Sequence, residues 1–104
     1  MSKMTDRERG FEAKYGFDLE QNFRVEAHLY KMLARWAAGE MGKDADEADG
    51  YALAVVGNVI SNPRENGIVE VLMADFAKNG VDISASQINA KIEELRPIAR
   101  EEVL

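Results

Sequence analysis

Four runs of apolar residues at helical spacing, separated by glycine, Asn-Pro and Asn-Gly breaks, restrict this chain to an all-α fold. The first run covers about residues 18–38 and ends at Gly39 and Gly42. It carries two apolar stripes, one of Val25, Leu29, Met32, Leu33 and Trp36 and another of Phe23, Ala27, Tyr30, Ala34 and Ala37. A helix that is apolar almost all round is typical of the centre of a bundle.

The second and third runs each predict a shorter helix with one apolar face. The second follows a cap at Asp44 or Asp46 and stops at Asn62-Pro63. The third extends from about Arg64 to Lys78, where Asn79-Gly80 supply the stop signal. The residues expected to face inward are Ala48, Tyr51, Ala52, Val55, Val56 and Val59 in the second and Ile68, Val69, Leu72, Met73 and Phe76 in the third.

The fourth run opens with Ser84-Ala85-Ser86-Gln87, the spacing of a capping box, and is expected to bury Ile88, Ile92 and Leu95. Pro97 is expected to end or kink this helix near Glu94. The preceding Val81-Asp82-Ile83 has no partner run for strand pairing and is interpreted as a linker with a hydrophobic staple. The pattern predicts a four-helix bundle over residues 18–104 with a flexible or loosely docked N-terminal arm.

The N-terminal arm, residues 1–17, differs from the bundle in having only a thin apolar stripe. Phe11 and Tyr15 are four residues apart, and the residues just before them alternate in charge: Asp6, Arg7, Glu8 and Arg9. Gly10 and Gly16 each cost a helix roughly 1 kcal/mol relative to alanine, so we expect a frayed or disordered arm in the free protein. Such a segment is either a solvated tail without function or a segment that folds on a partner.

Composition narrows the class of protein. With 104 residues and 46% hydrophobic content the chain is one small domain, and the lack of cysteine excludes disulfides and thiol chemistry. Through Lys43 there are 8 basic and 7 acidic residues, whereas from Asp44 onward there are 5 and 12. An acidic bundle repels phosphate backbones, so no nucleic-acid partner is expected. No apolar run approaches the roughly 18 residues of a membrane span, so we expect a cytoplasmic protein without membrane insertion.

The side chains needed for catalysis are sparse. His28 is the one histidine, no Gly-x-Ser-x-Gly turn accompanies it, and its place on the central helix favours a half-buried surface residue. Glu93-Glu94 and Glu101-Glu102 are adjacent pairs, which point in different directions on a helix and make no acid/base dyad. The sequence therefore predicts no enzyme and no catalytic residue.

Two short segments resemble ligand motifs without meeting their requirements. The acidic group of Asp44, Asp46, Glu47 and Asp49 lacks the glycine and terminal glutamate of an EF-hand. The segment 39–43, Gly-Glu-Met-Gly-Lys, lacks the glycine spacing and following hydroxyl of a phosphate loop, and helix termination explains it better. No metal site and no cofactor are predicted.

Residue identities in the first half of the chain carry a family resemblance. The stretch Asp6-Arg7-Glu8-Arg9-Gly10-Phe11-Glu12-Ala13-Lys14-Tyr15 and the later Trp36-Ala37-Ala38-Gly39 resemble the inhibitory zeta subunit of alphaproteobacterial F-type ATP synthases. Phe23-Arg24-Val25-Glu26-Ala27, Met41-Gly42-Lys43 and Tyr51-Ala52-Leu53 extend the match. Beyond about Ile60 the resemblance is mainly a matching order of helices.

The resemblance implies a mechanism and a set of partners. In the zeta family the N-terminal segment inserts as a helix at a catalytic alpha/beta interface of F1, contacts the central gamma rotor and blocks rotation in the hydrolytic direction. On matching positions, the inhibitory contact would consist of Asp6, Arg7, Glu8, Arg9, Phe11, Glu12, Lys14 and Tyr15. The protein would then associate peripherally with membrane-bound ATP synthase. The family is also associated with weak adenine-nucleotide binding, to which no residue is assigned.

Two segments depart from the family pattern. His28-Leu29-Tyr30 stands where family members often carry two arginines and an asparagine, and Tyr15-Gly16-Phe17-Asp18 replaces a more usual Phe-Ala-His-Asp. The first change removes positive charge and the second adds a glycine that weakens a helix. The alternative function is therefore a small regulatory bundle that binds a nucleotide or another protein, as a divergent paralogue without strong inhibition.

Overall fold

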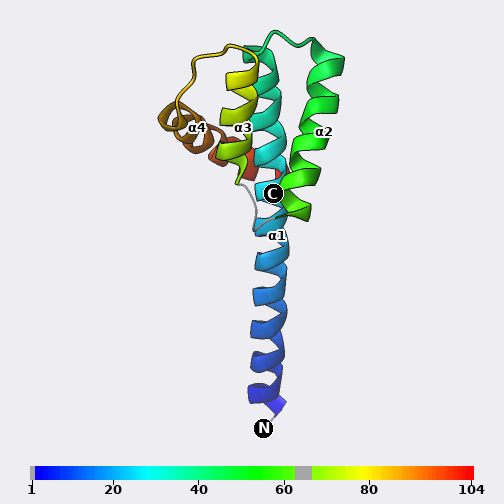
Figure 1. Cartoon of the computed structure of the whole chain (residues 1–104). Helices are drawn as coiled ribbons and strands as arrows, with labels where there is room; N and C mark the ends of the chain where they lie inside the picture. The colour runs from blue at the N-terminus through cyan, green and yellow to red at the C-terminus, as the bar shows by residue number, and fades with distance from the viewer. Residues whose placement is uncertain (1, 63–66) are drawn as a thin grey trace.

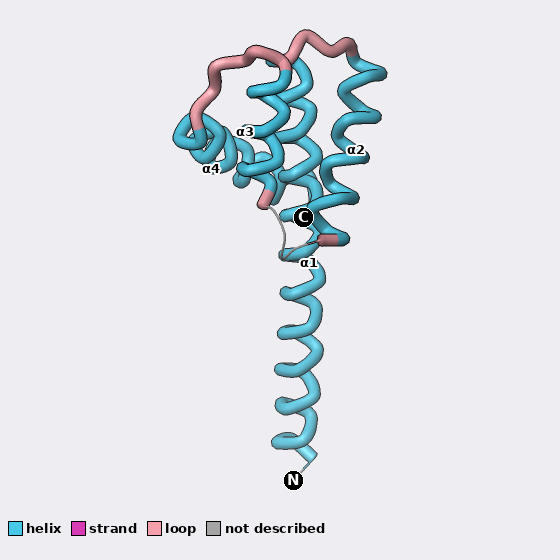
Figure 2. The backbone as a smooth tube through the Cα atoms, in the orientation of Figure 1, coloured by secondary structure: helices cyan, strands magenta, loops and turns pink. Residues whose placement is uncertain are grey.

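The chain folds into four helices connected by short loops (Figure 2). The computed structural model describes the backbone of residues 2–62 and 67–104 and the side chains of residues 20–62 and 67–104. The helices are α1 (Ser2–Glu40), α2 (Ala45–Ser61), α3 (Ile68–Lys78) and α4 (Ala85–Val103). No strand occurs within these two ranges, so the predicted all-α four-helix bundle is confirmed.

The longest helix, α1, belongs to the bundle over its second half and projects from it over its first half (Figure 1). At about 1.5 Å per residue its 39 residues span roughly 58 Å, which accounts for most of the 65 Å long dimension of the molecule. The predicted start near Asp18 is wrong, since the helical backbone continues through Gly16 and Gly10 to Ser2. Isolated glycines weaken a helix without ending it. The mobility of the arm in solution stays a prediction.

Two glycines end helices where the sequence predicts it. Gly42 and Gly80 adopt φ values of 80° and 67°, in the left-handed region that favours glycine. The next amides turn back on the helix, with Lys43 N–H donating to the Ala38 carbonyl at 3.0 Å and Val81 N–H to the Phe76 carbonyl at 2.9 Å. This is the Schellman arrangement, and it orients the chain toward the following helix in both places.

Side-chain caps begin α2 and α4. The Asp44 carboxylate accepts the Glu47 N–H at 2.8 Å, which decides between the two predicted caps. At α4, Ser84 Oγ accepts the Gln87 N–H at 3.2 Å while Gln87 Oε1 accepts the Ser84 N–H at 2.8 Å, so the predicted capping box is confirmed. α2 ends at Ser61, as expected. The predicted stop at Pro63 and start at Arg64 lie outside the described residues.

Pro97 does not end α4, which continues to Val103. A proline inside a helix removes one backbone hydrogen bond and costs about 3 kcal/mol, so the predicted stop had a sound local basis. Packing on both sides of it opposes that cost, because Leu95 and Ala99 are both buried. Of the two predicted outcomes, an end or a kink near Glu94, the end is therefore wrong, and the kink stays a prediction.

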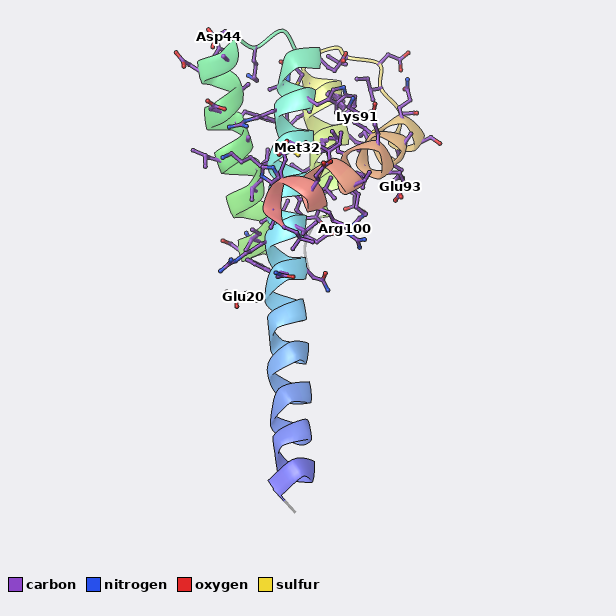
Figure 3. All side chains as sticks on the ribbon, turned by 180° about the vertical axis from the view of Figure 1, so that it is seen from behind. Glu20, Met32, Asp44, Lys91, Glu93 and Arg100 are labelled. Carbon is purple, nitrogen blue, oxygen red and sulfur yellow. The ribbon has the colours of Figure 1, made fainter. Side chains whose placement is uncertain are left out.

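The core lies where the other three helices meet the second half of α1, which packs mainly against α2 and α4. α4 crosses α1 steeply, in front of it in the view of Figure 3, and does not run alongside it. Buried apolar residues come from all four helices: Val25, Leu29, Leu33, Ala34, Ala37, Ala52, Val55, Val59, Ile68, Leu72, Phe76, Ile88, Ile92, Leu95 and Ala99. Two predicted inward residues, Phe23 and Met73, are exposed instead. Phe23 lies where α1 leaves the bundle, and Met73 lies off the Ile68, Leu72, Phe76 face of α3.

Candidate functional site

The arm is the helical part of α1 that extends beyond the bundle. All the predicted contact residues, from Asp6 to Tyr15, lie on this part of α1. Their side chains lie outside the description, but the continuous helical backbone places positions 11 and 15 on one face, one turn apart. At about 100° per residue, positions 6 to 9 are distributed around the helix. A partner that surrounded the arm would meet an aromatic stripe and, near the tip, charges on several sides.

At the base of the arm the bundle presents an apolar groove of about 400 Å³, here called the base groove. It is lined by Phe23, Glu26, Ala27 and Tyr30 from α1, Val59 and Ile60 from α2, and Gly67 and Ile68 at the start of α3. Phe23 is 59% exposed and Ile60 is 40% exposed, so large apolar side chains stand open to solvent here. The sequence missed this feature, because it predicted that Phe23 would be a core residue.

One carboxylate lies in the base groove, and it is already paired. Glu26 Oε1 contacts Arg96 Nη1, which reaches α1 from α4. Burial, followed by the nearby charge of Glu26, raises the pKa of the Tyr30 hydroxyl above its ordinary value, so Tyr30 is neutral at physiological pH. The groove therefore has little net charge and an apolar lining.

A second groove of about 550 Å³, here called the lateral groove, lies between α1 and α2 beside Val103. Its floor is apolar, and three basic side chains of α1 at helical spacing rim it: Arg24, His28 and Lys31. Arg24 pairs with Glu20 at 2.8 Å, whereas Lys31 has no ion pair with a described residue. His28 Nε2 contacts Glu102 near the end of α4, and its half-buried position confirms the prediction.

Polar and aromatic contacts hold the bundle together at its other end. The Tyr51 hydroxyl donates to Asp75 Oδ2 at 2.5 Å and so connects α2 to α3. Burial is the main cause that raises the pKa of Tyr51 above its ordinary 10.0, and the hydrogen bond to Asp75 and its charge add to it. Trp36 packs edge-to-face on Phe76 with ring centroids 6.0 Å apart, which agrees with its predicted place in the core. These contacts support the fold and leave the base of the arm open.

Three acidic side chains of the bundle, those of Asp44, Asp49 and Glu94, cap a helix or form an ion pair. Asp44 caps α2 at the end of the bundle far from the arm, whereas Glu20 lies where the arm leaves the bundle (Figure 3). Asp49 pairs with Arg35 at 2.9 Å, and Glu94 pairs with Lys91 at 2.8 Å. In the ranges searched, no group of three or more His, Cys, Asp or Glu residues could hold a metal ion.

A helix needs roughly 18 or more consecutive apolar residues to cross a bilayer. Within the described part of the chain, none is both long enough and apolar enough to cross a bilayer. α1 is long enough, but charged residues recur along it.

Comparison with known proteins agrees with this arrangement. A family model described as ATPase inhibitor subunit zeta matches residues 1–102, which include the arm, α1 to α3 and all but the last residue of α4. No curated protein and no solved structure matched the chain significantly. A match over nearly the whole length is decisive for membership, and the chain belongs to the ATPase inhibitor subunit zeta family.

Proposed function

We propose that this protein inhibits the F1 part of an ATP synthase by inserting its arm, as a helix, at a catalytic alpha/beta interface where it contacts the gamma rotor. Membership of the zeta inhibitor family supports the inhibitory role. The observation that carries the mode of inhibition is the continuous α1, whose first half stands clear of the bundle (Figure 1). A rigid connection to a bundle lets an inserted helix resist displacement by a moving rotor.

Within the arm the residues have different proposed roles. Phe11 and Tyr15 share a face and act as apolar anchors in pockets of the partner. The charged residues set the register of insertion through ion pairs: Asp6, Arg7, Glu8, Arg9, Glu12 and Lys14. The bundle limits how far the arm enters. In this role the protein is a regulatory subunit without catalytic activity of its own, held at the membrane surface by the enzyme it inhibits.

The direct test is to titrate the full chain into F1 from the same organism while ATP hydrolysis is measured. Saturable inhibition, together with co-elution of the chain and F1 on size exclusion, is the expected result. Bovine serum albumin at equal concentration controls for non-specific effects. If the chain neither co-elutes with F1 nor slows hydrolysis, the proposed function is wrong.

The lateral groove favours a second candidate function, regulation through a bound adenine nucleotide. An apolar floor suits a base, and Lys31 with its basic neighbours suits a phosphate. Titration with ATP, followed by amide NMR, separates the candidates. Shifts confined to the lateral groove, in a chain that leaves F1 activity unchanged, would favour nucleotide regulation over inhibition.

A further inference from the structure

The base groove lies on the same ridge of α1 as the aromatic stripe of the arm. Positions 11, 15, 19, 23 and 27 follow one another at four-residue steps on one unbroken helix. Such a row forms a continuous ridge that turns about 40° around the helix per step, or about 120° from position 11 to position 23. The last two positions, Phe23 and Ala27, line the base groove. A partner that wraps around the arm along this ridge therefore reaches the groove.

The chemistry of the base groove specifies an apolar occupant. Phe23 and Ile60 expose apolar surface, and Val59 and Ile68 form part of the lining behind them. The carboxylate of Glu26 is neutralised by Arg96, so the groove offers no free charge to attract an ion. The lateral groove, by contrast, has a basic rim. An aliphatic or aromatic side chain suits the base groove better than a charged group.

The arm alone is small for a stable contact. A standard protein–protein interface uses roughly 20–30 residues on each side, whereas the arm comprises residues 1–17. Further surface next to the arm must then join the contact, and the exposed apolar residues at its base are continuous with it. Contiguous exposed apolar patches commonly mark protein–protein interaction sites.

We infer that the base groove is a second docking site for F1, which receives an apolar side chain from the same F1 surface that takes the arm. This inference rests on the proposed function and adds a named contact to it. Phe23 and Ile60 are the residues that carry the contact. The groove stops the inserted helix by binding F1, in addition to blocking it by bulk.

Site-specific crosslinking tests the inference. Because the chain has no cysteine, a maleimide label attaches only to the cysteine that is introduced. Ile60→Cys and Ile98→Cys variants of the full chain are labelled with a benzophenone maleimide and irradiated with F1. Ile98 is a matched control, because it is also 40% exposed and lines neither groove. The expected result is a crosslink to an F1 subunit from position 60 that exceeds the crosslink from position 98. Equal yields, or a crosslink only to a second copy of the chain, would overturn the inference.

Substitution supplies the energetic test. Phe23→Ala and Ile60→Ala are expected to raise the concentration for half-maximal inhibition about tenfold, with Ile98→Ala within about twofold of the natural chain. Thermal melting of each variant shows whether the fold is kept. If Phe11→Ala weakens inhibition but Phe23→Ala and Ile60→Ala match the control, the inference fails and the proposed function stands. If the natural chain does not bind F1, both fail.

Discussion

The arm and the bundle belong to one chain and share one helix, yet they are stabilised in different ways. In the bundle, α1 packs mainly against α2 and α4, side-chain caps begin α2 and α4, and glycine turns follow α1 and α3. The first half of α1 projects away from these contacts (Figure 1). An isolated helix of this length is marginal in water, so tertiary packing stabilises only the second half. The bundle therefore supplies the stability of the fold, whereas the arm is available to bind a partner.

α1 extends through Gly10 and Gly16 in the arm, as α2 does through Gly50 and Gly57 in the bundle. Each glycine weakens its helix by roughly 1 kcal/mol, and the arm projects away from the packing that offsets this cost in the bundle. A partner that binds the arm supplies the missing packing. We expect binding to order the arm, whereas the bundle is ordered beforehand.

The largest expected contrast is in amide hydrogen exchange. Amides of residues 2–17 should exchange near the unfolded rate, because local opening of an unpacked helix costs little free energy. Amides of buried residues such as Val55 and Leu72 should exchange only through openings whose free energy approaches that of global unfolding, about 5 kcal/mol or more. Exchange measured by NMR on the free protein gives both values. Equal protection of the two regions would show that the arm is stabilised by contacts of its own.

In the bundle, Leu72→Ala should lower the free energy of unfolding by about 2–5 kcal/mol, because Leu72 is fully buried and the change leaves a cavity. Its neighbour Met73 is exposed, so Met73→Ala is the matched control and should cost less. Urea denaturation followed by circular dichroism measures both. Similar losses in the two variants would contradict the core assigned to α3.

In the arm, Phe11→Ala or Tyr15→Ala should weaken binding to F1 by about 1–3 kcal/mol if each fills a pocket of the partner. Asp6→Ala or Glu8→Ala at the solvated rim should cost less. The melting temperature of all four variants should match that of the natural chain. Inhibition titrations give the binding effect, and a drop in melting temperature would show that the arm contributes to the core.

The smallest expected effect concerns the Tyr51 hydroxyl. Tyr51→Phe should cost about 0.5–1.5 kcal/mol by removing the hydrogen bond to Asp75. Because the folded pKa is raised above the ordinary 10.0, this group contributes stability that is present below pH 10 and is lost as pH rises through the folded pKa. The free energy of unfolding, measured with urea at pH 8 and at pH 10.5, should therefore decline less in Tyr51→Phe than in the natural chain. In the control variant Tyr15→Phe, whose change lies in the arm, the free energy of unfolding should decline as much as in the natural chain.

Local signals in the sequence predicted those helix ends that depend on capping and glycine turns. The Ser84-Gln87 capping box and the glycine turns depend on residues within one helical turn, and the structure contains them as expected. Pro97 was misjudged because the packing of Leu95 and Ala99 that opposes its local cost comes from other helices. The contacts of Glu26 with Arg96 and of His28 with Glu102 join residues about seventy positions apart, beyond the reach of any local pattern.

In the candidate site, too, the sequence predicted the feature that depends on local spacing and missed the one that depends on packing. The aromatic stripe of the arm is a spacing that the sequence displays, and α1 places Phe11 and Tyr15 on one face. The base groove was missed because helical periodicity does not tell where along α1 the bundle ends. Phe23 has the spacing of a core residue, but α2 ends beside it at Ser61 and leaves it exposed.

Deletion of residues 1–17 compares the two regions in one experiment, with ATP hydrolysis by F1 and thermal melting measured on the same truncated chain. Every residue of the core cluster lies at Val25 or later, so the melting temperature should stay close to that of the full chain. Inhibition should be lost, because the anchors Phe11 and Tyr15 are gone. If the truncated chain inhibits F1 as strongly as the full chain, the arm is not the inhibitory element.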